Sequence, residues 1–336
     1  MRLALGPSGE SIDEILSAAR AAEAGGFDTA WFPEFHRTAF VPTAVAATAT
    51  SQIRLGTAIA LAFVRSPLTL ALNAIDLDEV SGGRFILGLG TGVARLNQDW
   101  HNAHFGRPVR HLRETVSIVR RVIATSHLDD AIEIEGEDER IRMHGYRRPF
   151  PPGRPDIPIY VGSMGPKMSR LAGEIADGWI ALEIGSPAHF KSEILPQIEA
   201  GLAEAGRGRQ SIELVASACC VVHPDSHEAK RRLAGLVAFY ASVRTYTAFF
   251  AWHGFEQEAL AIQERSRLGD TAGMIDACSD EMVDAFGLAG TADQVRKKLA
   301  EYEGTVDSIK LSPPTHHVSP EVTREAQESI LELFST

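Results

Sequence analysis

Two residues that can exchange protons, Glu34 and His36, follow the apolar run Thr29–Phe32. The run predicts a short buried strand, and barrel enzymes hold their chemistry just beyond the ends of such strands. Spaced two apart, a carboxylate and an imidazole can reach one ligand from an extended loop. The alternative is a surface loop with ordinary polar residues, which the segment Trp31–Arg37 by itself favours.

A glycine-rich segment, Gly88–Gly92, closes the apolar run Arg84–Leu89. A dinucleotide-binding fingerprint needs a third glycine where this chain has Val93, so that fingerprint is absent. Glycines without Cβ let the backbone approach a planar ligand closely. An ordinary turn from strand to loop explains the segment equally well.

A second glycine-containing loop, Gly162-Ser163-Met164-Gly165-Pro166-Lys167, lies between the predicted strand Ile157–Val161 and the predicted helix Pro166–Ala176. A helix begins with free N–H groups and a partial positive charge, which favour an anion such as phosphate. Lys167 adds a full charge. The alternative is a short loop without a ligand, but the lysine and the two glycines favour anion binding.

Metal and nucleophile chemistry find little support in the sequence. His101 and His104 are three apart and His316-His317 are adjacent, but no HExxH motif is present, and we expect no metal site. The serine-nucleophile motif G-x-S-x-G is also absent. An odd number of cysteines without a CxxC pair predicts reduced thiols.

The elements that must position these residues are eight apolar runs that alternate with amphipathic helices. This alternation predicts an α/β fold, the (β/α)8 TIM barrel, with a doubly wound open sheet as the rival. The predicted strands are Arg2–Gly6, Thr29–Phe32, Arg54–Ile59, Arg84–Leu89, Ile157–Val161, Gly178–Leu182, Glu213–Val222 and Ser308–Leu311.

The length of 336 residues exceeds the ~250 of a typical barrel. We expect a single barrel domain over 1–336, with the surplus in insertions at about 93–109, 127–156 and 239–290. The first and last follow strands 4 and 7, on the side where barrels build active sites. The middle one contains a predicted β-hairpin from Ala131–Glu135 and Arg140–His144.

The net charge and the hydropathy of the chain disfavour some classes of binding partner. The chain has 33 Lys and Arg against 44 Asp and Glu, a net charge of −11, which disfavours nucleic acid. No apolar stretch approaches the ~18 residues of a membrane span, and the N-terminus does not resemble a signal peptide. We therefore expect a cytoplasmic protein that acts on a small molecule.

Taken together, the motifs resemble the luciferase-like flavin and deazaflavin superfamily, and the likeness runs nearly end to end. Within this superfamily, the sequence segments Gly165-Pro166-Lys167-Met168 and Ala172–Gly178 are closer to the coenzyme F420-dependent branch. This branch includes the methylene-tetrahydromethanopterin reductases. The other segments that carry the resemblance are Arg65–Ala71, Ser81–Phe85, Leu87–Gly92, Pro158–Val161 and Gly290–Val295.

This resemblance implies coenzyme F420 as the cofactor, with FMN as the alternative. It implies that Glu34 contacts or tunes the ring, that Ala58-Ile59 is a non-proline cis peptide behind it, and that the loop Gly162–Lys167 holds the phosphate. The remaining residues that it places on the ring or its ribityl chain are Thr91, Gly92 and Asn97.

Two departures from the family pattern bear on chemistry. Many relatives have His directly after the acidic residue of the second strand, where this chain has Phe35; His36 is one position later and is the expected acid or base. Val93 replaces a glutamate that some deazaflavin dehydrogenases carry, which disfavours a sugar-phosphate substrate. The expected substrate-facing residues are Phe35, Trp100, His101, Tyr246 and Trp252.

The resemblance therefore implies an oxidoreductase that moves a hydride between the reduced deazaflavin and a small organic substrate. Two alternatives stay open: an FMN-dependent luciferase-like monooxygenase, and a non-catalytic protein that binds flavin or deazaflavin. We also expect a homodimer, and this expectation rests only on the resemblance to the family.

Overall fold

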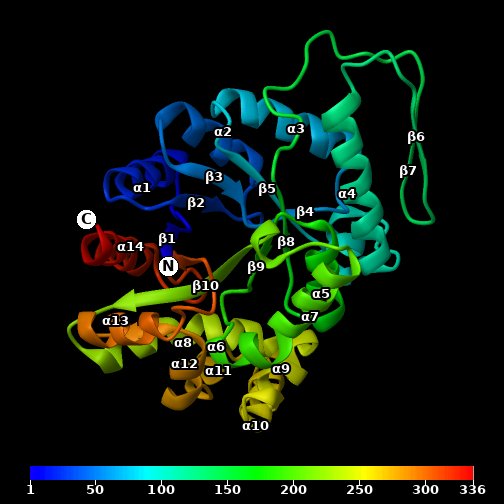
Figure 1. Cartoon of the computed structure of the whole chain (residues 1–336). Helices are drawn as coiled ribbons and strands as arrows, with labels where there is room; N and C mark the ends of the chain where they lie inside the picture. Colours follow the sequence, from blue (N-terminus) through cyan, green and yellow to red (C-terminus); the bar gives the residue numbers. More distant parts are fainter. Residues whose placement is uncertain (336) are drawn as a thin grey trace. The chain divides into compact units, whose positions relative to one another are not determined.

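The computed structural model describes residues 1–335, and strands alternate with helices along most of that length (Figure 1). Contacts between Cα atoms group the chain into two compact units. The first comprises Met1–Phe27, Leu182–Phe190 and the chain from Ala216 onward; the second comprises Asp28–Ala181 and Lys191–Val215. The expectation of one domain over 1–336 stays a prediction.

The second unit contains a parallel sheet with the order β2-β3-β5-β8-β9. The first residues of β10 pair with β9, and the short β4 pairs with the end of β5. The strands are β2 (Thr29–Phe32), β3 (Arg54–Thr57), β4 (Ala60–Leu61), β5 (Phe85–Gly90), β8 (Ile159–Gly162), β9 (Gly178–Ile180) and β10 (Glu213–Val222).

Helices of the second unit lie outside its sheet, with α2, α3 and α4 over β2, β3 and β5 in Figure 1. Their apolar faces cover strands that are buried along their full length, as parallel strands require. The helical elements of this unit are α2 (Phe40–Ala49), α3 (Pro67–Val80), η1 (Leu96–Trp100), α4 (Pro108–Thr125), α5 (Pro166–Ile175), η2 (Phe190–Ile194), α7 (Leu195–Glu204) and η3 (Arg209–Ser211).

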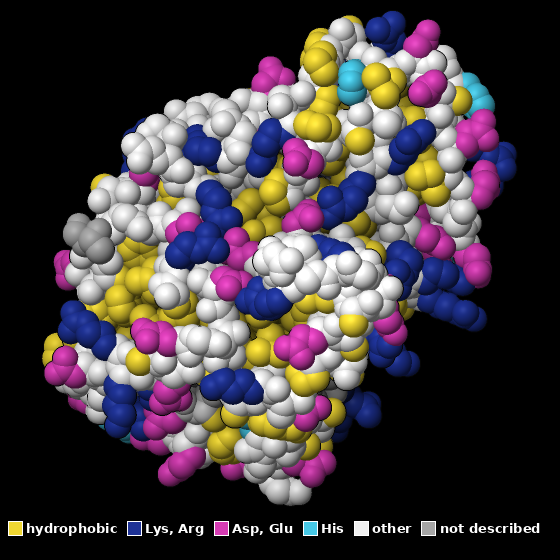
Figure 2. All heavy atoms as spheres, viewed as in Figure 1, with side chains coloured by type: hydrophobic (Ala, Val, Ile, Leu, Met, Phe, Trp, Pro, Cys, Tyr) yellow, Lys and Arg dark blue, Asp and Glu magenta, His cyan; other side chains and the backbone are white. Residues whose placement is uncertain are grey.

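The predicted hairpin of the second unit is confirmed. Strands β6 (Ile132–Glu135) and β7 (Arg140–Met143) pair antiparallel, with Glu135 opposite Arg140. The hairpin lies beside α4 in Figure 1. Over this part of the surface, acidic and basic side chains are interspersed (Figure 2).

The first unit contains the order β11-β10-β12-β1, in which β1 (Arg2–Leu5) pairs parallel with β12 (Ser308–Ser312). The segment 239–290 is mostly helical and ends in β11 (Leu288–Gly290), a strand that was not predicted. The helical elements are α1 (Ile12–Ala24), α6 (Pro187–His189), α8 (Ser226–Ser242), η4 (Arg244–Tyr246), α9 (Thr247–Trp252), α10 (Glu256–Arg267), α11 (Thr271–Asp276), α12 (Asp280–Phe286), α13 (Ala292–Ala300) and α14 (Pro320–Phe334).

Within residues 1–335, no single helix is long and apolar enough to cross a membrane, although the sharply bent pair Ser226–Ser242 and Arg244–Trp252 passes that test when taken together.

The eight predicted runs became the eight strands of a (β/α)8 barrel: β1, β2, β3, β5, β8, β9, β10 and β12. The segments 93–109 and 239–290 follow the fourth and seventh of them, as expected. Several strand boundaries differ from the prediction by one or two residues. The third strand, for example, was predicted to reach Ile59, but β3 ends at Thr57, just before the cis peptide Ala58-Ile59.

A buried polar cluster joins the strand starts of the second unit. The guanidinium of Arg54, at the start of β3, pairs with Asp28 and contacts Glu213 at 3.0 Å, and the Tyr160 hydroxyl donates to Glu213 at 2.7 Å. Burial lowers the pKa of Arg54, but the two carboxylates outweigh it and the net pKa is raised. Residues at this end of barrel strands serve stability.

We predict that Arg54→Met destabilises the protein by about 2 kcal/mol, because it leaves Asp28 and Glu213 largely buried without their cation. Chemical denaturation at neutral pH measures the change. The control is Arg170→Met, which breaks an exposed pair with Glu204 and should hardly move the midpoint. Equal effects of the two variants would contradict a special role for the cluster.

Candidate functional site

The carboxylate of Glu34 joins the end of β2 to the segment that follows β4. One oxygen accepts from the Leu61 N–H at 2.8 Å and from Arg65 Nη1 at 2.9 Å, and the other accepts from Arg65 Nη2. The Glu34 side chain is only 8% exposed. A guanidinium fork on a carboxylate fixes both groups in one geometry. Glu34 is therefore a fixed negative charge with both oxygens engaged.

Arg65 is the residue of this pair that sequence reasoning left without a role. It directly precedes Ser66, whose hydroxyl accepts from the Thr69 N–H at 3.2 Å and caps α3. A fixed helix start fixes the residue before it, and the Arg65 guanidinium also lies over the Phe40 ring at 5.1 Å. An arginine next to a Ser-Pro cap was the available signal.

The predicted cis peptide Ala58-Ile59 is present, between the end of β3 and the start of β4. A Cβ built on Gly90 or on Gly162 would come 2.7 Å from the Ile59 side chain, closer than real Cβ contacts allow. A Cβ on Gly88 would overlap the Thr57 carbonyl oxygen. These glycines thus have a packing reason that needs no ligand.

The loop after β5 is held from inside by Asn97. Its amide nitrogen donates to the Thr91 oxygen at 2.8 Å and to the Val93 oxygen at 3.0 Å, and the residue is fully buried. Its Oδ1 has no hydrogen-bond partner among the described residues. Gly92 has φ +61° and is exposed. Asn97 shapes this loop, and its contact with a cofactor stays a prediction, as for Thr91 and Gly92.

Ser163 anchors the second glycine-containing loop to β9. Its hydroxyl accepts from the Trp179 indole N–H at 2.9 Å and contacts Ser169 Oγ at 2.9 Å, while its N–H donates to the Ile180 oxygen at 3.1 Å. The polar groups of Ser163 are thus already engaged. These bonds position Ser163 in the loop, and its contact with a phosphate stays a prediction.

The start of α5 is open to an anion. The backbone N–H groups of Lys167 and Met168 lie in the first turn, where a helix offers them no acceptor. No described atom lies within 4 Å of a Cβ built on Gly165. Lys167 is exposed and has no ion pair with any residue in 1–335. This donor set fits a phosphate group.

Three of the expected substrate and acid–base residues lie close together in the second unit. The Phe35 ring is 4.3 Å from the His36 ring and 6.4 Å from the Trp100 ring. His36 is exposed and has no hydrogen bond within the part of the chain that is described. His101, also exposed, follows Trp100 at the end of η1. Phe35, His36 and Trp100 together present an aromatic surface that contains one imidazole, that of His36.

The other two expected substrate residues lie in the first unit. The Tyr246 ring is 5.6 Å from the Tyr240 ring, and Trp252 packs edge-on against His189 with centroids 5.0 Å apart. Their part in binding a substrate stays a prediction.

A buried ion pair of the first unit was not predicted. Lys310 Nζ, in β12, lies 3.0 Å from Glu183 Oε1, and the two side chains are 7% and 20% exposed. Burial raises the pKa of Glu183, but Lys310 and the Ser312 hydroxyl outweigh it, and the net pKa is lowered. A lysine inside the apolar run Ser308–Leu311 was the signal for this pair.

We predict that Lys310→Met lowers the free energy of unfolding by about 3 kcal/mol at pH 7, because it leaves the Glu183 carboxylate buried and unpaired. A carboxyl with a depressed pKa stabilises the fold above its unfolded pKa, and this contribution is lost as pH falls through the folded value. The difference between wild type and variant should therefore shrink below pH 4.5.

Denaturant titrations between pH 7 and pH 3 measure this difference. Arg265→Met is the control, since its pair with Asp270 is exposed and should contribute little at either pH. A difference that stays constant with pH would assign the effect of Lys310→Met to packing alone.

Comparisons with known proteins agree with this arrangement. A family model described as luciferase-like monooxygenase matches residues 2–308. A 5,10-methylenetetrahydromethanopterin reductase of Archaeoglobus fulgidus is 31% identical over 294 residues, covering 84% of this chain and 83% of the relative. A putative coenzyme F420-dependent oxidoreductase of Mycobacterium tuberculosis is 31% identical over 303 residues, covering 84% and 85%.

Among solved structures, the coenzyme F420 dependent tetrahydromethanopterin reductase from Methanopyrus kandleri superimposes with a TM-score of 0.83. It is 26% identical, and the match covers 99% of each chain. The resemblance read from the motifs is thereby confirmed.

Proposed function

The chain belongs to the luciferase-like monooxygenase family, and within this family we propose that it is a coenzyme F420-dependent oxidoreductase. In this proposal it transfers a hydride between the reduced deazaflavin and a small organic substrate. The open start of α5, with exposed Lys167, is the observation that carries the proposal, because it fits the phosphate of such a cofactor. The names of the archaeal and mycobacterial relatives support the choice of F420.

Each residue of the second unit has a distinct part in this proposal. When bound, the deazaflavin supplies the hydride chemistry. The Lys167 side chain and the first-turn N–H groups hold its phosphate. The backbone at Ala58-Ile59 and at Thr91-Gly92 would bind the ring, and Glu34 would supply a fixed carboxylate to the ring site.

A proton must accompany the hydride when the acceptor is a polar double bond. His36 is the proposed donor, since its ring is exposed beside Phe35 and Trp100 and its nitrogens are not engaged with any residue in 1–335. An aromatic surface of this kind suits a planar substrate. Glu34 is unsuited to the same task because both of its oxygens are already engaged by Arg65 and by the Leu61 N–H.

We predict that Lys167→Gln weakens binding of F420 about tenfold, since it removes one charged contact to the phosphate. Titration of the cofactor's absorbance or fluorescence measures the affinity. Lys191→Gln is the matched control: Lys191 is also an exposed lysine of the second unit, and its loss should leave the affinity unchanged. Parallel titration with FMN tests the cofactor itself; micromolar binding of FMN without binding of F420 would reject the proposal.

The description of the family model favours one rival, an FMN-dependent monooxygenase. Oxygen consumption that depends on reduced FMN and on substrate would support the rival, whereas oxidation of reduced F420 without oxygen uptake supports the deazaflavin enzyme. We also propose that the protein works in the cytoplasm as a homodimer, which light scattering of the purified protein tests for assembly.

A further inference from the structure

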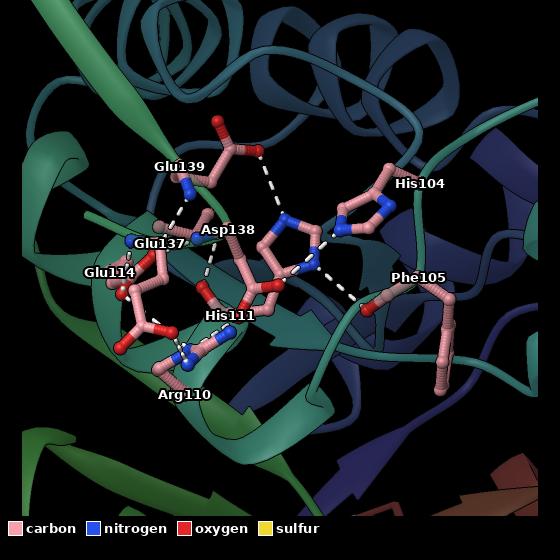
Figure 3. A network of polar contacts seen from close by, with 9 residues as sticks. His104, Phe105, Arg110, His111, Glu114, Glu137, Asp138 and Glu139 are labelled. Carbon is pink, nitrogen blue, oxygen red and sulfur yellow. Dashed lines mark hydrogen bonds and ion pairs between the residues drawn. The ribbon is translucent and has the colours of Figure 1, made fainter.

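A single carboxylate fastens the tip of the β6–β7 hairpin to α4. Glu114, in α4, accepts from the consecutive backbone N–H groups of Glu137, Asp138 and Glu139 at 3.1, 2.8 and 2.8 Å (Figure 3). Burial raises the pKa of Glu114, but the three N–H donors outweigh it and the net pKa is lowered. The tip is therefore held in place by a group that stays ionised at neutral pH.

Arg110, one turn before Glu114, balances the acidic side chains of the tip. It donates to Asp138 at 2.6 Å and pairs with Glu137. This contact, with His104 Nε2 at 3.3 Å from the same carboxylate, lowers the pKa of Asp138 to about 2.

His111 lies at the centre of this network with an oxygen at each ring nitrogen (Figure 3). Nδ1 is 3.0 Å from the Phe105 carbonyl oxygen, and Nε2 is 3.0 Å from Glu139 Oε1. A carbonyl oxygen and a carboxylate oxygen both accept hydrogen bonds, so a proton on each ring nitrogen would satisfy both contacts. Burial lowers the pKa of His111, but the Glu139 and Phe105 contacts outweigh it, and the net pKa is raised.

The His111 ring also stacks on Phe63, with centroids 3.7 Å apart and an interplanar angle of 2°. The Phe105 ring packs edge-on against Phe63, with centroids 5.6 Å apart and an interplanar angle of 78°. Phe63 lies between Leu61 and Arg65, the two residues that donate to Glu34. A cation on an aromatic face is attractive, and the attraction grows when both groups are buried.

We propose that His111, as an imidazolium, is a positioning residue of the candidate cofactor site. Through Glu139, Phe105 and Phe63 it holds together the hairpin tip, the segment 93–109 and the segment 61–65 that grips Glu34. The inference rests on the proposed function for its effect on cofactor binding, but not for its effect on the loops. Among the described residues, Asp138 also acts on the His111 ring and the His104 ring lies 5.8 Å from it, while Arg110, Glu114 and Glu137 are the charged groups that contact the tip around Asp138.

The sign of the pH dependence follows from the raised pKa. We call the contacts of the His111 imidazolium with Glu139, Phe105 and Phe63 the clamp. The clamp is complete below the unfolded pKa of His111, about 6.5. It is lost as pH rises through the folded pKa, when one ring nitrogen loses its proton. Affinity for the cofactor should therefore fall as pH rises through the folded pKa of His111, which lies above 6.5.

The first test needs no cofactor. In the full chain labelled with ¹⁵N-histidine, NMR should show both His111 nitrogens protonated at pH 6.5, and hydrogen exchange should show a protected Leu61 N–H. His111→Phe keeps an aromatic ring and should lower the protection of Leu61 about tenfold. A neutral His111 ring at pH 6.5, or unchanged Leu61 protection, would overturn the proposal.

Glu139→Gln provides a second, milder variant that keeps an acceptor for Nε2 but removes the charge. It should move the midpoint of Leu61 protection, and that of F420 affinity, to lower pH, whereas a purely structural role would leave both midpoints in place. His144→Gln is the control, because His144 is exposed and pairs with Glu133, away from the hairpin tip and from His111. If the loop responds as expected but F420 does not bind at any pH, the clamp stands and the proposed function fails.

Discussion

The arrangement of the candidate site depends on the carboxylate of Glu34. It is the acceptor on which the Leu61 N–H and both terminal nitrogens of Arg65 converge. A nearly buried carboxylate is costly to desolvate unless its oxygens are all engaged, and here they are. The pair therefore fixes where the chain goes between β4 and α3, and so where the cis peptide and its neighbours lie relative to β2.

Charged residues lie at both ends of the strands of the second unit and have a different role at each end. At the strand starts, Arg54 pairs with Asp28 and Glu213, and Glu213 accepts from the Tyr160 hydroxyl, so these contacts join neighbouring strands. Beyond the strand ends, Arg65 holds Glu34, while Lys167 stays unpaired in the described chain and available to an anion. In a barrel, the residues beyond the strand ends can change without weakening the charged cluster at the strand starts, because the length of the strands separates the two groups. The net charge of −11 says little about this local supply of cations.

Charged groups also attach the β6–β7 hairpin to α4. The hairpin tip is acidic, and it meets α4 through Glu114 and Arg110. Such polar attachments respond to pH where packed cores do not, since each depends on the protonation of its members. His111 is the one member that both belongs to this network and stacks on an aromatic side chain of the Glu34 segment.

The sequence by itself determined the order of the eight barrel strands, the hairpin and the family. These features depend on local patterns: apolar runs, turn residues and helix starts within a few positions of one another. Only the tertiary structure decided the partners of Glu34, the roles of Ser163 and Asn97, and the pairs Lys310–Glu183 and His111–Glu139. The last two pairs join residues 127 and 28 positions apart, and whether such charges meet depends on how the elements pack, which no local pattern records.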